Sequence, residues 1–98
     1  MTIQSVLTKL DTSMHPVAQV LHKGNDSKAL IIGFKKGMEL KDHSAKIASK
    51  LLVIKGQIMF RDTISEVELK QYEEVAIPAN EVHHVTALTD SLCILIQG

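Results

Sequence analysis

Short β-prone runs separated by turn residues follow one another from residue 16 to the end of the chain. The pattern predicts strands at residues 17–22, 29–35, 39–43, 49–55, 58–62, 66–70, 74–77, 82–88 and 92–97. Turn residues such as Gly24-Asn25-Asp26-Ser27 and Gly56-Gln57 lie between them. Parallel strands would need long crossovers, and no helical crossover is visible after residue 16. We therefore expect an all-β fold, an antiparallel sandwich or barrel.

The first fifteen residues have a different pattern. Ile3, Val6, Leu7 and Leu10 recur at helical spacing. This segment is either a short helix or an N-terminal arm laid on a neighbouring subunit. The predicted organisation is therefore an arm or helix over residues 1–15 and one β-barrel domain over residues 16–98.

The last predicted strand is apolar at every position from Leu92 to Ile96 rather than alternating. Such a run indicates a strand that is covered on both faces. A small chain covers a second face most easily by pairing with another copy of itself, so we expect a homodimer.

Composition narrows the classes of function. Eleven basic residues balance eleven acidic ones and aromatic residues make up only 3% of the chain, so we expect no nucleic-acid partner. The apolar runs are far shorter than the roughly 20 residues that span a bilayer, and the N-terminus lacks the pattern of a signal peptide. We expect no membrane partner and a cytoplasmic location. The single cysteine, Cys93, lies in an apolar run where a buried, inert thiol is expected.

Two short motifs carry a resemblance to a known family. Gly37, His43 and Gly56 match the spacing of the first cupin motif, while Ala45 stands in place of its second His and Ser49 in place of its Glu. Pro78 and His83 match the second motif, in which Tyr72, Asn80 and Ala87 replace two Gly residues and an Asn. Residues 29–97 thus resemble a small single-domain cupin with an incomplete set of metal ligands. The resemblance implies a double-stranded β-helix, or jelly-roll, barrel but no particular activity.

The alternation of side chains along a strand defines the candidate site. His43, Ala45 and Ser49 would share one face if the segment stayed regular, and His83 and His84 must point to opposite sides. The cupin motif selects His83 as the inward one. We therefore expect a ligand pocket formed by His43, His83, Ser49 and Met59.

Metal binding is a second hypothesis for the same residues. His43 and His83 are candidate ligands of a divalent transition metal, but a stable site needs three or four donors. Glu39 and Met59 are candidate extra donors that no motif places.

These residues support three functions. The leading hypothesis is a small molecule bound in a barrel cavity lined by aliphatic side chains of residues 29–33 and 51–54, with the reaction, if any, unknown. The alternative is a metal-dependent enzyme of the isomerase or dioxygenase type that uses His43 and His83. In the third, the cavity is filled by side chains and the domain is structural. A pocket histidine contributes little to an aliphatic core, so the first hypothesis predicts that His83→Ala leaves folding nearly intact.

Overall fold

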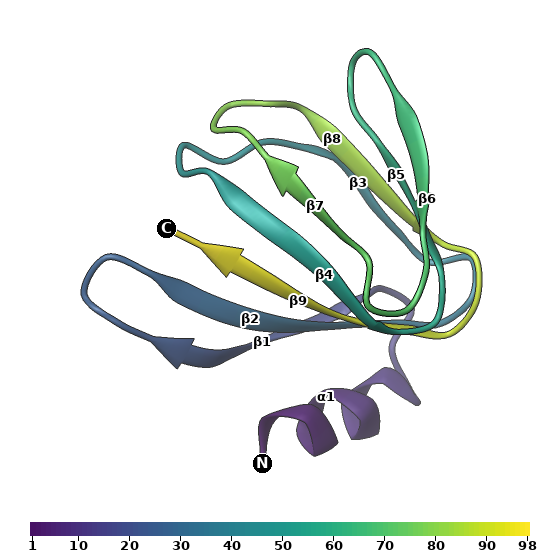
Figure 1. Ribbon diagram of the computed structural model, residues 1–98. Helices are drawn as coiled ribbons and strands as arrows, with labels where there is room; N and C mark the ends of the chain where they lie inside the picture. Colours follow the sequence, from purple (N-terminus) through teal and green to yellow (C-terminus); the bar gives the residue numbers. More distant parts are fainter.

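Two antiparallel β-sheets face each other, and a short helix lies against one of them (Figure 1). A computed structural model describes the backbone of residues 1–98 and all side chains except those of residues 42 and 43. The elements are α1 (Thr2–Leu10), β1 (Val17–Lys23), β2 (Lys28–Phe34), β3 (Glu39–His43), β4 (Ser49–Lys55), β5 (Ile58–Arg61), β6 (Glu66–Leu69), β7 (Glu74–Ile77), β8 (His83–Ala87) and β9 (Ser91–Gln97). The strand order is β1-β2-β9-β4-β7 in the larger sheet and β3-β8-β5-β6 in the smaller one.

The predicted strands and the all-β jelly-roll class are confirmed. Each predicted strand is present, and its ends differ from the prediction by no more than one residue. The N-terminal segment forms a helix, which is one of its two predicted alternatives. No helix among the described residues is long and apolar enough to cross a membrane.

The main core lies between the two sheets and follows from the alternation of buried and exposed positions. In β8, for example, His83, Val85 and Ala87 are buried, whereas His84 and Thr86 are more exposed. The core cluster contains Ile32, Phe34, Leu51, Val53, Ile58, Phe60, Leu69, Ile77, Val85, Ala87 and Cys93. Below, the inner face of either sheet means the face that carries these residues.

The helix packs on the outer face of the larger sheet through Val6 and Leu10. A glycine in β2 makes this close approach possible. A Cβ atom on Gly33 would lie 2.8 Å from Val6 Cγ1 and 3.3 Å from Leu10 Cδ2. The helix therefore covers β9 near Leu92, whereas Ile96 at the other end of the same strand is 40% exposed.

Several loops meet at one end of the barrel, which we call the mouth. They are residues 24–27, 44–48, 62–65 and 78–82, and Gly98, which follows β9, lies beside them (Figure 1). The backbone N–H of Asn80 donates to the carbonyl oxygen of Ala45 at 2.7 Å, and that of Gly98 donates to Ala48 at 3.2 Å. These bonds hold the loops against one another and fix the positions of the side chains that follow them.

Candidate functional site

His83, the first residue of β8, lies on the inner face of the smaller sheet at the mouth. It is 5% exposed, and its ring stacks on Phe60 with centroids 5.7 Å apart and an angle of 21° between the planes. Nδ1 lies 3.1 Å from the carbonyl oxygen of Glu81. A carbonyl oxygen only accepts, so the Nδ1–H group of His83 donates this hydrogen bond. This placement agrees with the inward orientation that the cupin motif implied for His83.

His43 is the last residue of β3, and the backbone register pairs it with His83. Its side chain lies outside the described residues. A register irregularity between Leu40 and His43 interrupts the regular alternation of β3. That the two imidazoles meet therefore stays a prediction.

Ser49 begins β4 and is half-buried on the inner face of the larger sheet. It has the same parity as the buried Leu51 and Val53, and it pairs with the core residue Ile77 in β7. On its other side Ser49 pairs with Gln97, which pairs in turn with Lys28 of β2. The inner face of this sheet therefore becomes polar at the mouth.

Met59 lies elsewhere than the pocket prediction requires. Its neighbours Ile58 and Phe60 are buried in the core, so Met59 projects from the opposite, outer face of β5. There it pairs with Glu68 and Thr86. Met59 does not share a wall with His83, and the prediction that it lines the same pocket was wrong.

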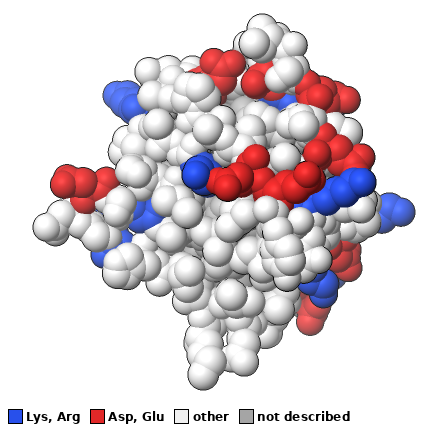
Figure 2. Space-filling model, in the orientation of Figure 1, with Lys and Arg blue, Asp and Glu red and all other residues white. Residues whose placement is uncertain are grey.

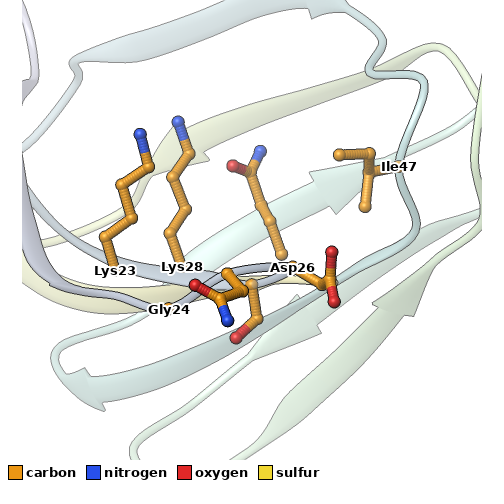
Figure 3. A pocket seen from close by; sticks show the side chains of 8 residues that line it. Lys23, Gly24, Asp26, Lys28 and Ile47 are labelled. Atoms are coloured by element: carbon orange, nitrogen blue, oxygen red, sulfur yellow. The ribbon is translucent and has the colours of Figure 1, made fainter.

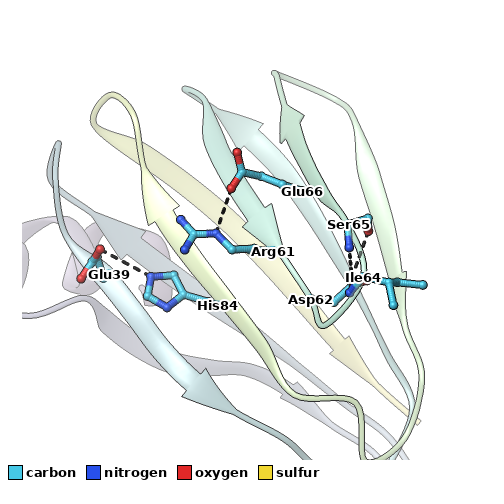
Figure 4. Close-up of polar contacts among 7 residues, drawn as sticks. All are labelled: Glu39, Arg61, Asp62, Ile64, Ser65, Glu66 and His84. Carbon is cyan, nitrogen blue, oxygen red and sulfur yellow. Dashed lines mark hydrogen bonds and ion pairs between the residues drawn. The ribbon is translucent and has the colours of Figure 1, made fainter.

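His84 and Glu39 also lie on the outer face of the smaller sheet (Figure 4). His84 Nε2 is 3.4 Å from Glu39 Oε1, and the side chains are 16% and 38% exposed. Leu40, not Glu39, packs against the core. Glu39 is therefore not an additional donor on the inner face.

The same outer face carries the ion pair between Arg61 Nε and Glu66 Oε2 at 2.9 Å (Figure 4). The turn that follows is held by Asp62, whose Oδ1 accepts hydrogen bonds from the backbone N–H groups of Ile64 and Ser65 at 3.0 and 2.8 Å. These two bonds stabilise the carboxylate and lower the pKa of Asp62 below its usual value. They organise a turn at the mouth.

The described donors do not complete a metal site. Among the described side chains there is no group of three or more His, Cys, Asp or Glu residues that could hold a metal ion. Cys93 is fully buried, and burial raises the pKa of its thiol to about 12, so it stays protonated and inert as expected. A metal at His83 would need His43 and donors that the described residues do not supply.

The barrel interior below the mouth is filled with side chains. Ile32, Leu51 and Val53 were expected to line a cavity, but each is at most 4% exposed and packs in the core. Ile31 and Ile54 project to the other side, toward α1. Any ligand near His83 therefore contacts the mouth rather than the centre of the barrel.

A cavity of about 360 Å³ opens at the mouth (Figure 3). Lys23 and Lys28 line one side of it, and Ile47 of the β3–β4 loop lies across from them. Neither lysine was among the site residues predicted from the sequence. Regular alternation from Val17 would place Lys23 on the outer face, but a bulge between Val20 and His22 moves it to the inner face opposite Lys28.

Comparison with known proteins identifies the architecture. No family model and no curated protein matches the chain. Among solved structures, a cupin superfamily protein from Desulfitobacterium hafniense superposes with a TM-score of 0.80 at 12% identity, over 87% of this chain and 78% of that one. A cupin-2 domain protein from Shewanella frigidimarina gives 0.77 at 15% identity, over 98% and 91%. The chain has a cupin fold.

A third cupin, a cupin 2 conserved barrel domain protein from Leptotrichia buccalis, gives a TM-score of 0.79 at 25% identity, over 88% of this chain and 42% of that one.

The backbone conformation at the turns agrees with the two cupin motifs. Gly37 and Gly56 have φ values of 87° and 91°, and Tyr72 and Asn80, which stand where the motif has Gly, have φ values of 70° and 65°. All four turn positions thus keep the left-handed conformation that glycine favours.

Proposed function

We propose that this cupin-fold protein binds a small molecule at the mouth of its barrel, with His83 as a polar contact. The observation that carries the proposal is a change from apolar to polar side chains along the inner faces of the two sheets. Both inner faces are apolar in the middle, and at the mouth they present His83 from one sheet and Ser49 with Gln97 from the other. A mostly apolar site with a few placed polar groups suits a small ligand.

The surroundings of His83 support a recognition role for its ring. Stacking on Phe60 and the bond to Glu81 hold the ring in one orientation, so little side-chain entropy is lost when a ligand binds. An imidazole ring can both donate and accept hydrogen bonds, so it suits a ligand that carries a hydroxyl, amide or amine group.

A metal-dependent enzyme of the isomerase or dioxygenase type is the alternative. The backbone register between His43 and His83 favours it, because paired residues of adjacent strands lie close together. Such an enzyme would use a divalent transition metal as a Lewis acid. The donor set described above does not complete that site, so small-molecule binding stands first.

The experiment compares ligand binding and metal content in matched variants. A fragment library is screened by ligand-observed NMR against tag-free protein purified without chelator, and against His83→Asn and His22→Ala. His22 is an exposed histidine of β1 and serves as the control. We expect fragments that bind the wild type and His22→Ala but bind His83→Asn at least about tenfold more weakly.

Two outcomes would overturn the proposal. Fragments that bind His83→Asn as well as the wild type would show that His83 makes no contact with them. Near-stoichiometric metal, measured by mass spectrometry and lost in both His43→Ala and His83→Ala, would favour the metal-dependent enzyme instead.

A further inference from the structure

A row of polar side chains crosses the inner face of the larger sheet at the mouth. The register pairs Lys23 with Lys28, Lys28 with Gln97, and Gln97 with Ser49. On β7, the next strand, Ser49 pairs with the core residue Ile77. Because paired residues project to the same face, the row lies on the inner face of the sheet. The row therefore projects toward the barrel axis and not toward the outer face where α1 packs.

The two lysines of this row are direct cross-strand partners. Like charges at such positions repel each other and destabilise the pairing of the strands. Among the described residues, ion pairs join Lys50 to Glu74, Arg61 to Glu66 and His84 to Glu39, and none includes Lys23 or Lys28. Asp26 lies in the same turn but forms no ion pair with either lysine. No described carboxylate therefore lies within ion-pair distance of either lysine.

The lysines face a space that can hold a ligand. Figure 3 shows their side chains extended side by side in the same direction, with Ile47 across the cavity. Lys28 is half-buried, which strengthens its interaction with an anion relative to a fully exposed lysine. Gln97 also lines the cavity and adds an amide donor beside the two ammonium groups.

We propose that Lys23 and Lys28 form an oxyanion site, so that the small molecule bound at the mouth carries a carboxylate or phosphate group. The inference rests on the proposed function and names the chemical class of its ligand. The oxyanion lies between the two ammonium groups and accepts from Gln97, while Ile47 contacts an apolar part of the molecule. An anion there replaces the repulsion between the lysines with two attractive contacts.

The test uses malonate and inorganic phosphate as probes. Each is titrated at constant ionic strength into ¹⁵N-labelled protein, and backbone amide shifts are recorded for the wild type and for the double variant Lys23→Gln/Lys28→Gln. Lys36→Gln/Lys70→Gln removes the same charge from exposed positions at the opposite end of the barrel and serves as the matched control. Sodium chloride replaces the probe in a blank titration.

We expect shifts confined to residues 23–28, 47 and 97, unchanged in the control and weakened about tenfold or more in the double variant. Stronger binding of malonate assigns a carboxylate ligand, and stronger binding of phosphate assigns a phosphorylated one. Shifts spread over the surface, or equal in wild type and double variant, would overturn the site.

The inference and the proposed function fail separately. A fragment that requires His83 but binds Lys23→Gln/Lys28→Gln with unchanged affinity would overturn the oxyanion site and leave the proposed function in place. Probes that bind at the two lysines, while no fragment depends on His83, would overturn the proposed function and leave the oxyanion site in place.

Discussion

Replacing His83 tests whether its side chain stabilises the fold at the mouth, because the ring packs against Phe60 as well as lying in the candidate site. His83→Ala removes the ring stacked on Phe60, which is worth about 0.5–1.5 kcal/mol, and the hydrogen bond to Glu81, which is worth about 0.5–1.5 kcal/mol. The side chain is only 5% exposed, so water does not replace these contacts freely. We expect a loss of about 2 kcal/mol in the free energy of unfolding, in contrast to the nearly intact folding predicted from the sequence.

The assay is urea denaturation followed by circular dichroism at fixed protein concentration, with linear extrapolation to water. His83→Asn keeps a hydrogen-bond donor near the position of Nδ1 but loses the ring. It should therefore lose about half as much free energy of unfolding as His83→Ala. His22→Ala, at an exposed position, should change stability by less than about 0.5 kcal/mol. A loss below about 0.5 kcal/mol for His83→Ala would contradict the packing described for this ring.

Three further predictions concern a turn, a titrating group and an interface. Tyr72 is 75% exposed and has a φ of 70°, a left-handed conformation that costs a residue with a Cβ atom more than it costs glycine. Tyr72→Gly should therefore raise the free energy of unfolding by about 1 kcal/mol in urea denaturation. An unchanged midpoint would contradict strain at this turn. The lowered pKa of Asp62 contributes stability that is present above the unfolded value and is lost as pH falls through the folded value. The stability advantage of wild type over Asp62→Asn should therefore shrink in denaturation curves as the pH falls below about 4, and a constant difference would contradict this. The outer face of the larger sheet is mostly uncharged over β9 and α1 in Figure 2, and Ile96 is 40% exposed there. We therefore expect light scattering at micromolar concentration to give the mass of a homodimer, and Ile96→Lys to give the mass of a monomer. A monomeric wild type would refute the predicted homodimer.

The strands could be predicted from the sequence because the alternation of apolar and polar side chains is a local property. The runs at 49–55 and 74–77, for example, end at residues whose turn chemistry is visible in the chain, and both strands have the predicted bounds. The positive φ of Asn80 also follows from local residue type, since Asn adopts positive φ readily. His83 could be oriented from its position in the motif.

The faces of irregular strands could not be predicted, because a bulge adds one residue and reverses every side chain beyond it. The bulge in β1 turns Lys23 toward the barrel axis, and only its pairing with Lys28 reveals this. Met59 is a different case, because local alternation with the apolar residues Ile58 and Phe60 suffices to place its side chain on the outer face.

The sequence by itself determined the order of the strands along the chain and their approximate ends, since each depends on residues close together in the chain. The resemblance to the cupin motifs implied the jelly-roll class. Only the tertiary structure decided which side chains share the mouth, because that depends on register between strands far apart in sequence. Lys28, Gln97 and Ser49 form one row across three strands, and their spacing along the chain gives no sign of it. Long-range backbone pairing thus places the groups from which the candidate site is built.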